Sequence, residues 1–120
     1  HGVAADQVFA ANGSNEVLQT LLLAFAGPGR RVATFEPTYQ LHGHIARLTG
    51  AEVVEGERRG DFTLDVDAAR ALLAAAEPTV TFLCSPNNPT GLVEPASQGR
   101  SLENPLPTPT PVIPLAALRT

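Results

Sequence analysis

Short apolar segments alternate with longer amphipathic segments as far as residue 84, and this alternation limits the folds that the chain can adopt. The short segments are rich in β-branched and aromatic residues, which is typical of strands, and the longer ones carry leucines at helical spacing. Strands that alternate with helices make right-handed crossovers and a mostly parallel sheet, so we predict an α/β fold. We expect strands at 7–11, 31–35, 51–55 and 79–84, helices at 15–26 and 39–49, and a third helix capped by Asp65 that runs through Ala76.

The pattern changes after Pro95. Residues 96–120 show neither helical nor strand periodicity, and prolines at alternate positions exclude a helix and a central strand. The few apolar residues there cannot offset the entropy of ordering the backbone. We therefore expect 1–95 to be the folded part and 96–120 to be a proline-rich tail that is disordered or locally extended.

Three polar loops fall at the carboxyl ends of the expected strands, at 12–14, 37–39 and 85–91. Ligands of parallel α/β sheets bind at this edge. Gly13, Ser14 and Asn15 begin a helix, whose free N–H groups suit an anion such as phosphate. The same three residues would also suit an ordinary strand-to-helix turn with a serine cap.

The loop at 85–91 reads Ser-Pro-Asn-Asn-Pro-Thr-Gly and is the most specific motif in the chain. Its two prolines restrict the backbone, and an asparagine held between them offers both a carbonyl and an amide NH2 to a ligand. An ordinary turn would tolerate many other sequences, so this motif favours a functional loop.

This motif resembles the corresponding loop of the fold-type I, pyridoxal-phosphate (PLP) dependent aminotransferases of class I and II. Three further stretches add to the likeness and are similar to histidinol-phosphate aminotransferases in particular. They are Asn12-Gly13-Ser14-Asn15-Glu16, Gly27-Pro28-Gly29 and Pro37-Thr38-Tyr39. The resemblance extends from His1 to about Pro95 and implies part of a three-layer α/β/α large domain.

The resemblance also implies roles for individual residues. The backbone of Gly13, Ser14 and Asn15 would bind the phosphate of PLP, and Tyr39 would stack on its pyridine ring. Asn88 would hydrogen-bond the 3′ oxygen of the cofactor. His42 would support the acid that pairs with the pyridine nitrogen, although many histidinol-phosphate enzymes have an aromatic residue at this place.

Three residues that the family requires are absent from their expected places. These are an aspartate for the pyridine nitrogen, the Schiff-base lysine and an arginine for the substrate carboxylate. The chain contains no lysine at all. We therefore expect no catalytic residue in this chain, and no transamination by it alone at an enzymatic rate.

Composition narrows the remaining classes of function. The net charge of -4 argues against a nucleic-acid partner or a membrane surface, both of which favour a basic face. The single cysteine, Cys84, excludes an internal disulfide and fits a cytoplasmic protein. His42 and His44 lie two residues apart and would point to different faces of a helix, so we expect no metal site.

Three hypotheses follow. The first is the front part of a PLP aminotransferase, with a tail that comes from a shifted reading frame or a wrongly assigned gene end. The loss of pattern after Pro95 and a first residue, His1, in a chain without methionine favour it. Its parent would be a homodimer that transaminates histidinol phosphate with 2-oxoglutarate in histidine biosynthesis. Aromatic-amino-acid aminotransferases and threonine-phosphate decarboxylase share the Pro-Thr-Gly loop and remain alternatives. The second hypothesis is a non-catalytic remnant that binds phosphate or PLP, and the third is an unrelated α/β phosphate binder.

Overall fold

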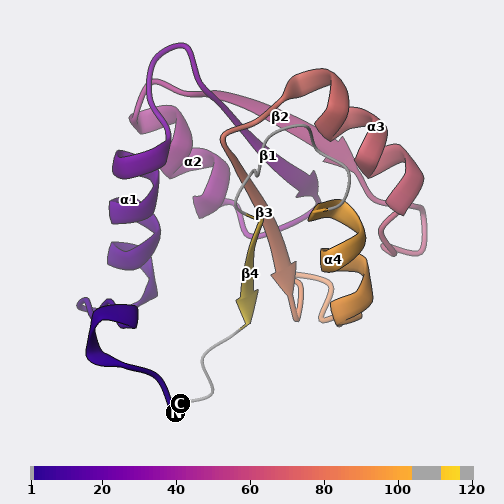
Figure 1. The fold of residues 1–120 in the computed structure, drawn as a ribbon. Coiled ribbons are helices and arrows are strands. Elements are labelled where there is room, and N and C mark those ends of the chain that lie inside the picture. Colours follow the sequence, from indigo (N-terminus) through magenta and orange to yellow (C-terminus); the bar gives the residue numbers. More distant parts are fainter. Residues whose placement is uncertain (1, 104–111, 117–120) are drawn as a thin grey trace.

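The computed structural model describes residues 2–103 and 112–116, and its elements follow the expected alternation (Figure 1). A 3-10 turn, η1, comes first, and helices and strands then alternate through β4. The elements are η1 (Ala5–Gln7), α1 (Ser14–Phe25), β1 (Arg31–Glu36), α2 (Leu41–Leu48), β2 (Glu52–Glu57), α3 (Val66–Ala76), β3 (Val80–Ser85), α4 (Ala96–Glu103) and β4 (Val112–Ala116).

The four strands form one parallel sheet in the order β2-β1-β3-β4. β1 pairs with β2 along its whole length, from Arg31 opposite Glu52 to Glu36 opposite Glu57. β3 lies on the other side of β1, with Val32 opposite Val80. Because all the strands run the same way, their carboxyl ends meet at one edge of the sheet. The parallel α/β fold that the sequence predicts is confirmed.

Two apolar clusters cover the two faces of the sheet, which makes three layers. Side chains alternate between faces along a strand, so Val32 of β1 packs with α1 and α2 while Ala33 and Phe35 pack with α3 and α4. Figure 1 shows α1 and α2 on one side of the sheet and α3 and α4 on the other. The helices contribute Leu18, Leu22 and Ala46 to the first cluster, and Ala69, Leu73 and Leu102 to the second.

Helices α2 and α3 end or begin at residues that favour helix ends. Asp65 caps α3, where its carboxylate accepts a hydrogen bond from the backbone N–H of Ala68 at 3.0 Å. Gly50 follows α2 with a φ of 82° and donates its N–H to the carbonyl of Arg47.

In the part of the chain that the structure describes, no helix combines the length and the hydropathy that crossing a membrane requires.

The strand predicted at 7–11 is wrong. This stretch begins with the last residue of η1 and continues as irregular backbone, with Val8 58% and Phe9 62% exposed. A short apolar run becomes a strand only where a neighbouring strand accepts its hydrogen bonds. Among the described strands none pairs with these residues.

The expectation that 96–120 lacks helix and strand is also wrong for two segments. α4 occupies 96–103, which contains no proline because Pro95 and Pro105 flank it, and Leu102 is 1% exposed in the second apolar cluster. β4 includes Pro114, and it lies at an edge of the described sheet, where a missing N–H is tolerated. The remaining residues of the predicted tail, 104–111 and 117–120, lie outside the described residues.

Candidate functional site

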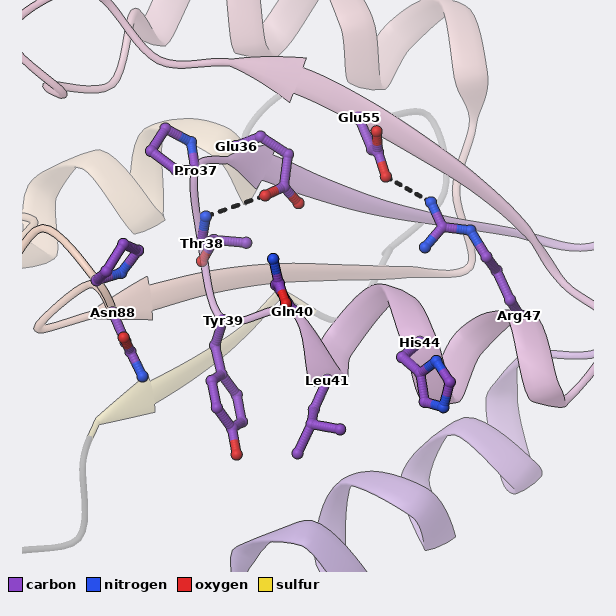
Figure 2. A pocket seen from close by; sticks show the side chains of 11 residues that line it. Glu36, Pro37, Thr38, Tyr39, Gln40, Leu41, His44, Arg47, Glu55 and Asn88 are labelled. Carbon is purple, nitrogen blue, oxygen red and sulfur yellow. Dashed lines mark hydrogen bonds and ion pairs between the residues drawn. The ribbon is translucent and has the colours of Figure 1, made fainter.

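The loops that leave β1 and β3 lie next to each other at the carboxyl edge of the sheet. β1 and β3 are neighbouring strands, although their loops are about fifty residues apart in the chain. Figure 2 shows Tyr39 from the first loop and Asn88 from the second, with both side chains extending in the same direction. The sequence predicted this meeting, and it brings two of the candidate residues together.

The loop after β1 is held by the last residue of that strand. One carboxylate oxygen of Glu36 accepts the hydroxyl of Thr34 at 3.0 Å, and the other accepts the backbone N–H of Thr38 at 3.0 Å. Because the chain turns here, α2 begins only at Leu41, two residues later than the helix expected from 39. Tyr39 therefore stands in the loop, half-buried, rather than on the helix.

The loop after β3 is organised around Asn87, whose side chain is buried while that of Asn88 is exposed. The Oδ1 atom of Asn87 accepts the hydroxyl of Thr38 at 2.9 Å. Its Nδ2 atom donates to the carbonyl of Pro37 and to the hydroxyl of Thr90, each at 2.9 Å. The buried asparagine thus joins the two loops, and the exposed one is left free to face a ligand.

A cavity of about 880 Å³ opens beside these loops. Most of its wall comes from the loop after β1 and from the start of α2, and Figure 2 shows the side chains that line it. Its charged groups are Glu36 and the ion pair in which Arg47 donates to Glu55 at 2.5 Å. The lining residues are Glu36, Pro37, Thr38, Tyr39, Gln40, Leu41, His44, Arg47, Glu55, Asn88 and Pro89.

His42 lies beneath Tyr39 rather than in the cavity wall. The two rings meet edge to face with centroids 5.4 Å apart, and His42 stacks on Phe82 at 4.5 Å with 11° between the ring planes. Burial in this apolar setting lowers the pKa of His42 to about 4, so its ring is neutral at pH 7. Its Nδ1 atom is buried and has no hydrogen-bond partner among the described residues.

The amino end of α1 forms the third part of the site. Gly13 precedes the helix with a φ of 88°, a conformation that favours glycine, and no side chain caps the helix there. Gly13, Ser14 and Asn15 are all exposed. The hydroxyl of Tyr39 makes a long hydrogen bond of 3.5 Å to the Oδ1 atom of Asn15, which connects this helix end to the loop after β1.

The structure therefore groups three of the predicted residues, Tyr39, Asn88 and Asn15, and leaves the others outside this group. Tyr39 and Asn88 share the cavity, and Asn15 touches Tyr39. Gly13 and Ser14 precede Asn15 in the chain but do not line the cavity, and His42 contacts Tyr39 without lining the cavity itself.

Sequence reasoning missed the residues that hold the loops. Asn87 stands beside Asn88 in the motif, and only its hydrogen bonds to Thr38 and Pro37 show that it joins the two loops. The other missed contact is a buried ion pair of Arg58 with Glu94, in which Arg58 also donates to the carbonyls of Phe35 and Phe62 at 3.2 Å. Both contacts join segments that lie far apart in the chain, so no local sequence pattern indicates them.

The remaining reactive side chains stand apart. Among the described residues, no group of three His, Cys, Asp or Glu side chains could hold a metal ion. His44 is exposed while His42 is buried, so the two point to different faces of α2, as their spacing predicted. Cys84 is partly buried at the end of β3 and is a free thiol.

Comparison with known proteins identifies the family. The family model for "Aminotransferase class I and II" matches residues 2–104. Histidinol-phosphate aminotransferases of Thermobifida fusca and Streptomyces avermitilis are 55% and 52% identical over 95 residues, which is 79% of this chain and 26% of each relative. A solved structure of a putative histidinol-phosphate aminotransferase from Erwinia carotovora is 28% identical, with a TM-score of 0.75 over 83% of this chain and 29% of that one. The chain spans about a quarter of the length of the curated relatives that it matches, and it belongs to the class I and II aminotransferases.

Proposed function

We propose that this chain forms the part of a PLP-dependent aminotransferase that holds the cofactor's phosphate and one face of its ring. The observation that carries the proposal is the placement of Tyr39 beside Asn88 in one cavity, with the Tyr39 hydroxyl on Asn15 at the start of α1. A flat ring, an amide and a helix N-terminus are thus assembled from three separate loops.

The chemistry of these groups fits a phosphorylated aromatic ring. The first backbone N–H groups of α1 have no partner within the helix, and no side chain caps them, so they are free for a dianion. The Tyr39 ring meets the His42 ring edge to face and is only half-buried, so part of its surface remains available for stacking. The exposed amide of Asn88 provides donors for a ring oxygen.

When bound, PLP supplies the electron sink that stabilises negative charge at the substrate's α-carbon. The residues of this chain bind and orient that group: Gly13, Ser14 and Asn15 hold its phosphate, Tyr39 covers its ring, and Asn88 donates to its 3′ oxygen. His42, which is neutral, contacts the Tyr39 ring and helps to hold that ring in position. The sequence has no lysine, so the residue that carries the cofactor and moves the proton does not come from residues 1–120.

The substrate proposal rests on the relatives rather than on the cavity. Identity of more than 50% to histidinol-phosphate aminotransferases over 79% of the chain supports histidinol phosphate as the amino donor of the parent enzyme. On the family resemblance alone we propose 2-oxoglutarate as the acceptor and a cytoplasmic homodimer as the assembly. We propose that 1–95 belong to the large domain of such an enzyme, on which α4 and β4 pack. Aromatic-amino-acid aminotransferases and threonine-phosphate decarboxylase are the competing assignments, because their Pro-Thr-Gly loop is the same.

Equilibrium dialysis of the 120-residue chain against PLP tests the binding role. We expect reversible binding that inorganic phosphate competes with. Tyr39→Leu should weaken the binding roughly three- to tenfold, the effect of losing an aromatic stacking partner. Phe62→Leu removes another partly exposed aromatic ring, outside the cavity lining, and should leave the affinity unchanged. Equal losses in both variants, or no binding by the unmodified chain, would contradict the proposal.

A non-catalytic remnant that binds PLP or phosphate is the second candidate. Sequencing the coding DNA from the Gly91 codon onward separates the two. A second reading frame that continues into Asp-x-x-Tyr and then Ser-x-x-Lys would support the aminotransferase. The absence of such a frame would support the remnant.

A further inference from the structure

The Asn87 side chain is a buried amide whose hydrogen bonds determine its orientation. The side chain is in the loop after β3, and the residue is 2% exposed. Pro37 offers only a carbonyl, so the atom that faces it at 2.9 Å must be the NH2 group of Asn87. The second proton of that group goes to the Thr90 hydroxyl, and Oδ1 receives the Thr38 hydroxyl. No other side chain of this size could both donate and accept in this arrangement.

The partners of Asn87 are the residues next to the proposed cofactor contacts. Pro37 and Thr38 come directly before Tyr39, and Asn87 comes directly before Asn88. The loop after β3 is itself closed by two backbone bonds of 2.7 Å, from the Asn87 N–H to the Leu92 carbonyl and from the Gly91 N–H to the Asn87 carbonyl. A movement of either loop would therefore have to break bonds to one buried side chain.

We infer that Asn87 is a positioning residue, which sets the distance between the Tyr39 ring and the Asn88 amide so that both engage the same flat ligand. The inference rests on the proposed function, because it assumes that Tyr39 and Asn88 share a ligand. Asn87 does not touch that ligand. It acts through Thr38 and Pro37 on one side and through the backbone of Asn88 on the other.

The first test needs no cofactor. Tyr39 is the only tyrosine in the chain and there is no tryptophan, so intrinsic fluorescence reports on this ring alone. In the ligand-free chain, Asn87→Ala and Thr38→Val should lower the anisotropy of Tyr39 and increase its quenching by acrylamide. Thr38→Ser keeps the hydroxyl donor and should restore the values of the unmodified chain. Unchanged anisotropy and quenching in Asn87→Ala and Thr38→Val would overturn the inference, and Thr38→Val decides if Asn87→Ala does not fold.

The second test is a double-mutant cycle with PLP, followed by quenching of Tyr39 fluorescence. We expect Asn87→Ala to weaken PLP binding about three- to tenfold, the effect of losing one or two net hydrogen bonds. Competition by inorganic phosphate should not change, because the start of α1 makes none of the Asn87 bonds.

In the Asn88→Ala background the same substitution should weaken PLP binding less than it does in the unmodified chain, because only the effect that Asn87 exerts on Tyr39 through Thr38 and Pro37 then remains. If the losses of PLP affinity caused by the two single substitutions multiply in the double variant, the positioning role would be overturned. Failure of the unmodified chain to bind PLP would overturn the proposed function, and the ligand-free fluorescence would still decide whether Asn87 couples the loops.

Discussion

At the scale of single residues, the site contrasts two buried polar side chains. All the donors of the Asn87 side chain are satisfied, whereas the Nδ1 atom of His42 has no partner among the described residues. A buried polar atom without a partner costs free energy, so in a native site it often marks a place where another group binds. Stacking on Phe82 holds the His42 ring even so.

The depressed pKa of His42 predicts a pH-dependent stability. The imidazole binds a proton near pH 6.5 in the unfolded chain and only near pH 4 in the folded one. Between these values the unfolded state holds more protons, so stability is complete above about pH 6.5 and falls as the pH is lowered towards 4. We expect the free energy of unfolding to drop by about 2 kcal/mol between pH 7 and pH 5 from this group.

Urea denaturation at the two pH values checks this expectation. His42→Phe keeps an aromatic ring on Phe82 and removes the titration, so its stability should change less over the same interval. Equal losses in the variant and the unmodified chain would show that His42 is not responsible.

At the scale of elements, most helices and strands of the three-layer fold were predictable, and the exceptions depend on partners that lie far away in the sequence. Leu18 and Leu22, four residues apart, indicated α1, and the apolar run 79–84 indicated β3. The strand at 7–11 failed because pairing depends on a neighbour that no local pattern reveals. α4 was missed because Leu102 is stabilised by packing against the second apolar cluster rather than by periodicity.

The residues of the candidate site divide in the same way, into those that local motifs indicate and those that depend on distant segments. Tyr39 and Asn88 could be identified from motifs, whereas Asn87 and the Arg58–Glu94 pair could not, because they join segments about fifty and thirty-six residues apart. Contacts of this kind depend on the three-dimensional arrangement and have no local signature.

We expect the removal of one partner of the Arg58–Glu94 pair to lower the stability of the protein strongly. Arg58, which follows β2, and Glu94, which ends the loop after β3, have side chains 0% and 6% exposed. Glu94→Ala would leave a buried guanidinium without its partner, and we expect a loss of about 3–5 kcal/mol in the free energy of unfolding.

The surface pair Arg31–Glu52 provides the control. Its side chains are 47% and 64% exposed, so Glu52→Ala should cost no more than about 1 kcal/mol. Denaturation curves of the two variants compare them directly, and similar losses would mean that the buried pair does not secure the loop.

At the scale of the whole molecule, the parallel sheet brings the loops after β1 and β3 together at one edge, the start of α1 contacts the first of them, and our claim is that all three serve one ligand. The start of α1 would bind a phosphate and the loops after β1 and β3 would bind a ring, with the Tyr39–Asn15 contact between them. The class I and II aminotransferase family to which the chain belongs makes PLP the ligand to test.

The most direct measurement is to follow backbone amide NMR signals of the 120-residue chain while PLP, and separately inorganic phosphate, is added. The account predicts that phosphate shifts the amides of Ser14, Asn15 and Glu16. PLP should shift these and also the amides of 38–40, Asn87, Asn88, Thr90 and Gly91. Shifts by PLP that spare the two loops, or shifts scattered over the molecule, would contradict a single cofactor site at this edge of the sheet.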